Sequence, residues 1–185
     1  MFLIAIINLL ILTGQIHNTA SSPCSEVKIV NHILKWGQET TNRPRKIEAI
    51  IIHSSYNALT PDSFSLDGVL REYKAAGVTP HYIIDRQGVI YRLAPDENIA
   101  YQAGKSRLPD GHTDVNARSI GIEIINTTHD SPTEAQYVSL AKLVKCLKSE
   151  YPVKYVLGHS DIAPGRKTDP WNFDWKKFDG LLKQN

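Results

Sequence analysis

Two histidines stand where apolar segments end, and their side chains could bind a metal ion there. His53 ends the segment 47–53, and His159 directly follows the segment 153–158. Both segments are rich in β-branched and aromatic residues, which predicts two strands. Because ligands in open α/β sheets lie beside strand ends, the two imidazoles can reach one point if these strands are neighbours.

A third metal ligand is predicted in the charged stretch after His159, and Asp169 is the best candidate. Pro170 disfavours the helical conformation of the residue before it, so residues 167–169 are expected to be extended. Side chains alternate along an extended segment, which sends Lys167 and Asp169 to the same side. Two histidines, one carboxylate and an open position for water are typical of a catalytic zinc site.

The spacing of these residues also allows a structural interpretation. The zinc-binding pattern HExxH is absent from the sequence, and a lone histidine at a strand end is commonly a hydrogen-bonded structural residue. His81 starts an apolar segment and is interpreted as a core residue. The remaining histidines are interpreted as surface or processing residues: His17, His32, His112 and His129.

The elements that must position these side chains are predicted from composition and periodicity. Gln87 and Gly88 predict a hairpin between two of the strands. Apolar residues at helical spacing predict helices over 63–76, over 133–151 and from about Asp174. Segments rich in β-branched and aromatic residues predict five strands, at 47–53, 81–85, 89–93, 119–125 and 153–158.

Strands that alternate with helices predict a single α/β domain. The continuous apolar run 49–52 indicates strands covered on both faces, and the element order favours a mixed central β-sheet of about five strands flanked by helices. A chain of 185 residues, 42% of them hydrophobic, is long enough for one domain with a core. A net charge of +2, with no basic run of interleaved aromatics, argues against nucleic-acid binding.

The N-terminal residues predict export. Residues 2–12 are mostly apolar, which is short of the roughly 20 residues of a bilayer span but enough for a signal-peptide core of about 7–15. The small residues Ala20 and Ser22 predict cleavage after Ser22, although no basic residue precedes the apolar run. A buried or disordered N-terminal stretch is the alternative interpretation.

Two cysteines, Cys24 and Cys146, remain after such a cut. In an oxidising compartment they could form one disulfide, and two unpaired thiols are the alternative. Pro23 directly before Cys24 fits a lipoprotein cleavage site poorly, so a lipid anchor is not expected.

Five motifs resemble, in order and spacing, the zinc-dependent N-acetylmuramoyl-L-alanine amidases of the type 2 family, which includes phage amidase lysozymes and peptidoglycan recognition proteins. The resemblance covers about residues 46–180, and it implies the fold of that family. It also implies hydrolysis of the amide bond between N-acetylmuramic acid and L-alanine in peptidoglycan or its muropeptide fragments. The motifs are "IIIHSS" (50–55), "TPHYIIDRQGVIYRL" (79–93), "YQAG" (101–104), "SIGIEI" (119–124) and "GHSDIAPGRKTDP" (158–170).

The resemblance further implies roles for individual residues. His53, His159 and Asp169 match the three ligands of one zinc ion. Glu123 matches the general base, and Lys167 matches the cation that stabilises the oxyanion. In this scheme zinc activates a water molecule, and Glu123 takes its proton and later returns one to the leaving nitrogen.

The chain departs from the family pattern at several positions. Pro80 stands where the phage branch has a tyrosine, which favours the bacterial branch that uses a glutamate. That branch commonly has Trp-His-Ala-Gly where this chain has "YQAG", so Gln102 replaces an imidazole. Arg118 stands where a smaller or apolar residue is usual. The candidate substrate-binding residues are therefore Tyr101, Asn116 and Arg118, and the exact muropeptide is left open.

Two other functions stay open at this point. One is a peptidoglycan-binding module without catalysis, although such modules typically lack a metal ligand and all three positions are filled here. The other is a serine hydrolase that uses Ser54 or Ser160, but Ile162 stands where the nucleophile elbow requires a second glycine.

The expected organisation is a signal peptide over 1–22, an N-terminal extension over 23–45 and a zinc amidase domain over 46–183. We expect a monomer that is exported to the periplasm or cell envelope, that acts on peptidoglycan or muropeptides, and whose mature chain has no stable membrane span.

Overall fold

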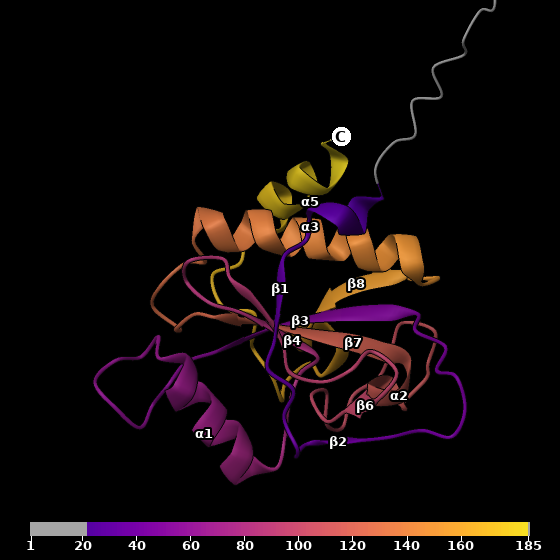
Figure 1. The fold of residues 1–185 in the computed structure, drawn as a ribbon, viewed down its shortest axis with the longest axis horizontal. Helices are drawn as coiled ribbons and strands as arrows, with labels where there is room; N and C mark the ends of the chain where they lie inside the picture. The colour runs from indigo at the N-terminus through magenta and orange to yellow at the C-terminus, as the bar shows by residue number, and fades with distance from the viewer. Residues whose placement is uncertain (1–21, 185) are drawn as a thin grey trace, which may run out of the picture.

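The computed structural model describes residues 22–184, and its strands form a central sheet between helices (Figure 1). The predicted cleavage site and the apolar run 2–12 lie outside the described residues, apart from Ser22. In chain order the elements are η1 (Pro23–Glu26), β1 (Ile29–Asn31), β2 (Gln38–Glu39), β3 (Ala49–Ser55), α1 (Leu66–Ala76), β4 (Tyr82–Ile84), β5 (Ile90–Arg92), β6 (Ile99–Ala100), α2 (Val115–Arg118), β7 (Ser119–Ile125), α3 (Glu134–Glu150), β8 (Tyr155–Gly158), α4 (His159–Ile162) and α5 (Trp175–Lys183).

The main sheet is mixed and has six strands in the order β1-β5-β4-β7-β3-β8. The four strands β4, β7, β3 and β8 run parallel to one another, and β4 and β5 form the predicted antiparallel hairpin. All five predicted strands are confirmed. The sixth, β1, pairs with β5 at the sheet edge; its sequence is only three residues long, too short for a periodicity signal. Strands β2 and β6 form a separate two-stranded sheet.

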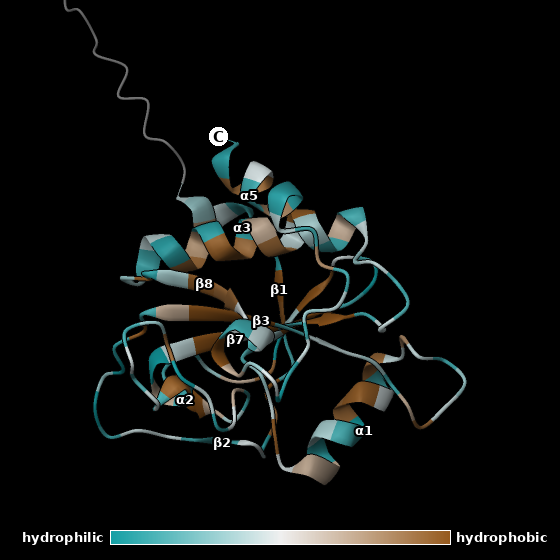
Figure 2. Cartoon of the chain, turned by 180° about the vertical axis from the view of Figure 1, so that it is seen from behind, coloured by the Kyte–Doolittle hydropathy of each residue, from teal (hydrophilic) through white to brown (hydrophobic). Residues whose placement is uncertain are grey.

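Helix α3 covers one face of the sheet, and η1 and α5 lie beside it (Figures 1 and 2). The isoleucines at alternate positions of β3 and β7 pack against this helix. Thr133 begins α3 with a capping box in which its hydroxyl accepts from the Gln136 backbone and Gln136 accepts from the Thr133 backbone. The apolar contacts of this face are made by Ile50, Ile52, Ile120, Ile122, Ile124, Tyr137, Leu140, Val144 and Leu147.

The opposite face of the sheet is covered by α1 and by the loops around α2 and α4. Val69 and Leu70 of α1 pack on Ile83 and Ile125, and Ile51 contacts a second cluster that includes residues of α2 and α4. Both faces are therefore buried, which explains why the run 49–52 is continuously apolar. Because side chains alternate, His53 and Glu123 point to this second face, away from α3.

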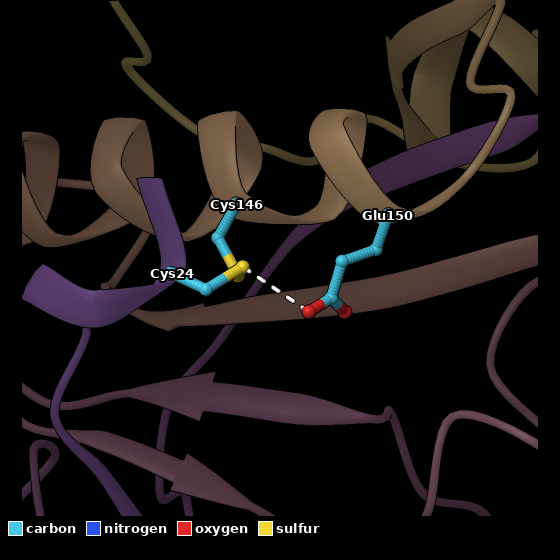
Figure 3. Close-up of side chains that lie close together, drawn as sticks. All are labelled: Cys24, Cys146 and Glu150. Carbon is cyan, nitrogen blue, oxygen red and sulfur yellow. Dashed lines mark hydrogen bonds between the residues drawn. A yellow bond between two sulfur atoms is a disulfide. The ribbon is translucent and has the colours of Figure 1, made fainter. Parts of the chain in front are cut away.

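A disulfide between Cys24 and Cys146 joins η1 to α3 (Figure 3). Of the two alternatives that the sequence allows for these cysteines, the structure therefore has the disulfide. The Glu150 carboxylate lies 3.2 Å from the Cys24 sulfur, but a disulfide sulfur carries no proton to donate to it.

None of the helices within residues 22–184 is both long and apolar enough to cross a membrane.

Candidate metal centre

The metal centre is built where three neighbouring strands end. His53 and Glu123 are paired in register between the parallel strands β3 and β7. On the other side of β3, Ile52 is paired with Gly158 of β8, so His159, the next residue, begins α4 beside His53. His53 lies two residues before the end of its strand, slightly further inside the sheet than the sequence predicts.

Asp169 reaches the same point from the loop that follows α4. Its backbone oxygen accepts a hydrogen bond from Ser160, 2.8 Å away, which folds the loop back onto the start of α4. Residues 167–169 form neither helix nor strand. Arg166 holds the loop from its other side by donating to the backbone oxygens of Ala103 and Lys105.

The three predicted ligand side chains converge in the interior. His53 Nδ1 lies 3.0 Å from His159 Nδ1, and Asp169 Oδ2 lies 3.2 Å from His159 Nδ1 and 3.4 Å from His53 Nδ1. Each residue is at most 6% exposed. Ligand atoms about 2.0–2.1 Å from a tetrahedral ion stand about 3.3 Å apart, so these separations fit a metal ion.

The second nitrogen of each histidine supports the same conclusion. His53 Nε2 lies 2.5 Å from Gln102 Oε1, and His159 Nε2 lies 3.1 Å from the Ala103 backbone oxygen. Both oxygens are acceptors, so each neutral imidazole carries its proton on Nε2. The two Nδ1 lone pairs then face each other and a carboxylate without a proton between them, an arrangement that a cation would satisfy.

The surroundings of the site shift the pKa values of two of the three groups, His53 and Asp169. Burial lowers the pKa of His53, which favours its neutral form. For Asp169 burial acts to raise the pKa, whereas His159 and His53, when protonated, lower it below the usual range by hydrogen bonding and by charge. Two imidazoles and one carboxylate are the donor set of a metal ion such as zinc.

Glu123 is buried beside the ligands, and its pKa is raised to about 8. Burial is the main cause and the Asp169 charge is the second, whereas the hydroxyls of Ser55 and Tyr73 and the charge of Lys167 act to lower the pKa. A carboxyl group whose pKa lies near neutral can both accept and release a proton at neutral pH. Burial thus gives Glu123 the property that a general base requires.

Lys167 is partly exposed and close enough to act on the Glu123 pKa. Within residues 22–184 it makes no ion pair shorter than 4.0 Å. Its ammonium group is therefore free to meet a negative charge that develops at the site.

The three candidate substrate-binding residues lie in different places. Tyr101 is exposed and its hydroxyl donates to Glu39, 2.9 Å away. The Asn116 side-chain oxygen accepts from the backbone N–H groups of Gln102 and Ala103. Arg118 ends α2, directly before β7 and five residues before Glu123, and its guanidinium pairs with Glu48 and Asp114. The structure does not bring Arg118 to the metal centre.

Gln102, the residue that replaces the imidazole of the family pattern, contacts one of the predicted ligands. Its side-chain oxygen lies beside His53 Nε2. Gly121 makes this possible, because a Cβ atom there would lie 2.6 Å from Gln102 Cγ. The sequence signal was the departure from the family pattern at residue 102, but the sequence does not show to which neighbour the amide points.

His81 is fully buried and takes part in the core, as predicted. Its Nδ1 accepts from the Gly121 backbone, and its Nε2 lies 3.1 Å from the Asn98 oxygen. Burial, followed by the charge of Arg45, lowers its pKa to about 3. His81 therefore stays neutral and supports the strand that carries Glu123.

The serine hydrolase alternative finds no support in the described part of the chain. The hydroxyl groups of Ser54 and Ser160 hydrogen-bond to no histidine there, and the buried Ser54 hydroxyl has no partner at all in these residues. Ser54 also points to the α3 face by alternation with His53.

A hollow on the surface of the molecule lies away from the metal centre. It has a volume of about 960 Å³ and lies between η1, α3 and α5, where it is lined by Lys142, Lys145 and Lys148 among others. None of the metal-binding side chains reaches it. Convergent buried polar groups, and not volume, mark the candidate site.

Residues 43–172 match the family model of N-acetylmuramoyl-L-alanine amidase. This range contains all of the predicted ligands and Glu123, and the chain therefore belongs to the N-acetylmuramoyl-L-alanine amidase family. The resemblance seen in the five motifs is confirmed, as is the mixed α/β fold.

Individual relatives agree with this assignment. The chain is 41% identical over 110 residues to the 1,6-anhydro-N-acetylmuramyl-L-alanine amidase AmpD of Escherichia coli strain K12; the match covers 58% of this chain and 60% of that relative. It superimposes on the structure of a selenomethionine AmpD derivative with a TM-score of 0.71 and 28% identity, covering 85% and 95% of the two chains. The chain thus spans about 60% of the length of the curated AmpD that it matches.

A second solved structure contains a bound substrate. It is the Escherichia coli amidase AmiD in complex with anhydro-N-acetylmuramic acid-L-Ala-D-γ-Glu-L-Lys. This chain superimposes on it with a TM-score of 0.64 and 26% identity, covering 77% of this chain and 60% of AmiD.

Proposed function

We propose that this chain hydrolyses the amide bond between N-acetylmuramic acid and L-alanine in peptidoglycan or its muropeptide fragments, with one zinc ion held by His53, His159 and Asp169. The observation that carries the proposal is the convergence of three buried ligand atoms, within 4.8 Å of one another, beside a glutamate with a raised pKa. Family membership and the amidase names of the relatives support the same reaction.

The residues of the chain divide the chemistry among them. When bound, zinc supplies Lewis acidity, which lowers the pKa of a water molecule and polarises the amide carbonyl. Glu123 accepts the proton of the attacking water and returns it to the L-alanine nitrogen as the amide bond breaks. Lys167 stabilises the negative charge on the carbonyl oxygen in the transition state.

The surroundings of the site fit a ligand that extends beyond the scissile bond. A hollow of about 270 Å³ lies where the chain leaves β3 and β7, at the same edge of the sheet as His53 and Glu123. It is lined by Tyr56, Ser63, Phe64, Thr127, Thr128, His129 and Asp130. A muropeptide like the one bound to AmiD has a sugar on one side of the cleaved bond and a peptide on the other, and Tyr101 is our candidate for a stacking contact.

The disulfide supports export, because such bonds persist in oxidising compartments. We propose that residues 1–22 are a signal peptide and that the chain acts in the periplasm or cell envelope. The monomeric state stays a prediction.

The decisive experiment compares the purified zinc-loaded chain with its Glu123→Gln variant on defined muropeptides. Mass spectrometry should detect a free peptide that begins with L-alanine, and the release should stop with a chelator and return with zinc. Glu123→Gln should keep zinc but lose about 100-fold or more of the turnover, the typical contribution of a general base.

Two other results would change the conclusion. A zinc-loaded chain that binds muropeptides but releases nothing would be a peptidoglycan-binding module. Normal turnover by Glu123→Gln would remove Glu123 from the mechanism. The rates on anhydro-muropeptides, reduced muropeptides and intact peptidoglycan would show the substrate preference.

A further inference from the structure

The loop residue Gln102 lies behind the metal centre and contacts one of its ligands from the side opposite the ion site. We infer that Gln102 is a positioning residue, which fixes the proton of His53 on Nε2 and so keeps the Nδ1 lone pair directed at the metal. This inference rests on the proposed metal site, and it concerns a residue that itself touches neither metal nor substrate.

The orientation of the Gln102 amide follows from its second partner. The Ser119 hydroxyl lies 2.6 Å from the backbone oxygen of Val115, which can only accept, so the hydroxyl must donate to it. The Ser119 oxygen then has only lone pairs left for Gln102, 3.0 Å away, and that contact must be made by the amide nitrogen. The amide oxygen is thereby forced to face His53.

An amide oxygen at 2.5 Å from His53 Nε2 requires a proton on that nitrogen. A neutral imidazole has one N–H group, so Nδ1 is left as a bare lone pair. Nδ1 is the atom that faces His159 and Asp169. A sequence of three hydrogen bonds, from Val115 through Ser119 and Gln102, therefore determines the tautomer of a metal ligand.

The backbone at Gln102 is itself held in place. The Asn116 side-chain oxygen accepts from the N–H groups of both Gln102 and Ala103, at 3.2 and 2.8 Å. Arg45, a half-buried guanidinium, donates to the backbone oxygens of Asn116 and Ser119. The group that orients His53 is therefore fixed from two sides.

The neighbouring residue does the same for the second histidine. The Ala103 backbone oxygen accepts from His159 Nε2 at 3.1 Å and from Arg166 at 2.7 Å. One dipeptide thus orients both imidazoles, the first through a side chain and the second through the backbone. Only the first contact can be removed by substitution, which makes Gln102 the residue to test.

The test uses Gln102→Met, which keeps the length of the side chain but has no acceptor oxygen. Long-range ¹H–¹⁵N spectra of the histidine side chains report which ring nitrogen carries the proton, first in the metal-free chain and then with zinc. The wild type should show His53 protonated on Nε2 in both states, whereas metal-free Gln102→Met should show a mixture of tautomers. Zinc competition should give a Kd about 10–100-fold weaker for Gln102→Met, as is typical for partners of metal ligands.

Two further variants separate positioning from stability. Ser119→Ala leaves Gln102 in place but allows its side-chain amide to rotate by about 180°. Like Gln102→Met, it should give a mixture of His53 tautomers in the metal-free chain, but with a smaller change in zinc Kd. Gln136→Met makes the same chemical change at a buried glutamine that bonds to the backbones of Ile84 and Ile125. This control should lower the melting temperature while the zinc Kd and the His53 tautomer stay unchanged.

The outcomes distinguish this inference from the proposed function. If the wild type binds zinc and Gln102→Met binds it equally well with the same His53 tautomer, Gln102 is not a positioning residue, and the proposed function stands. If the wild type binds no zinc and its His53 carries the proton on Nδ1, both the metal site and the role of Gln102 are wrong.

Discussion

Within residues 22–184, two clusters each bring together three side chains of the types that bind metal ions, and they differ in whether those side chains have lone pairs to offer. His53, His159 and Asp169 meet on the face of the sheet opposite α3, and all three are buried. Cys24, Cys146 and Glu150 meet where η1 packs against α3 (Figure 3). The ligand atoms in both clusters lie within 4.8 Å of one another, so proximity does not distinguish them.

The difference lies in which lone pairs are available. In the histidine cluster, the oxygens of Gln102 and Ala103 accept from Nε2 of the two imidazoles, so the Nδ1 lone pairs face the centre of the cluster. In the cysteine cluster, the two sulfur atoms are bonded to each other and offer no thiolate, and Glu150 is exposed. The comparison teaches that the hydrogen bonds behind the ligands, and not the ligand types alone, identify a metal centre.

The largest effect that tests this comparison is the loss of zinc from Asp169→Ala. Removing the carboxylate of the three predicted ligands leaves only the two imidazoles, which should abolish zinc binding at micromolar concentrations. Equilibrium dialysis followed by metal analysis measures the occupancy. The matched control is Glu150→Ala, the carboxylate of the other cluster, which should keep one zinc per chain; full occupancy of Asp169→Ala would mean that another residue is the third ligand.

The second effect concerns the disulfide, which should contribute to stability and not to metal binding. Cys24 and Cys146 are 122 residues apart, and loop-closure entropy for that length predicts a loss of up to about 5 kcal/mol of unfolding free energy in a Cys24→Ser, Cys146→Ser variant. Urea denaturation measures the loss, and zinc titration under native conditions should give an unchanged Kd. A parallel loss of zinc affinity would contradict the separation of the two clusters.

The smallest effect is a pH dependence of stability that arises from Glu123. Its pKa is about 8 in the folded chain, against an ordinary value of 4.5. Between these values the folded chain keeps a proton that the unfolded chain releases, so this residue makes the metal-free protein less stable as pH rises.

The Glu123→Gln variant removes that titration. Its unfolding free energy, relative to the metal-free wild type, should therefore increase from about pH 5 to about pH 8 and then level off. Denaturation of both proteins across this range measures the difference. A difference that does not change with pH would show that the Glu123 carboxyl has an ordinary pKa.

Much of the fold could be predicted from the sequence because its elements have strong local signals. The isoleucine runs of β3 and β7 and the capped apolar pattern of α3 each indicate their structure without reference to the rest of the chain. The meeting of His53 and His159 could be predicted from the strand ends, and that of Asp169 from the proline that follows it.

The groups behind the ligands could not be predicted in the same way. Gln102, Ser119 and Asn116 act through contacts between segments that the topology brings together, and a backbone oxygen such as that of Ala103 leaves no mark in a sequence. The sequence likewise does not show that Arg118, which stays a candidate for substrate contact, pairs with Glu48 and Asp114.

The position of the disulfide along the chain divides the metal site between two topologically different parts. His53, Gln102 and Glu123 lie on the covalent ring that the bond between Cys24 and Cys146 closes. His159, Lys167 and Asp169 lie on the open tail beyond it, whose only strand, β8, pairs with β3 alone. The proposed metal ion, shared by His53 of the ring and by His159 and Asp169 of the tail, would close a second loop. Metal binding would then hold in place the part of the sheet that lies outside the disulfide-closed ring.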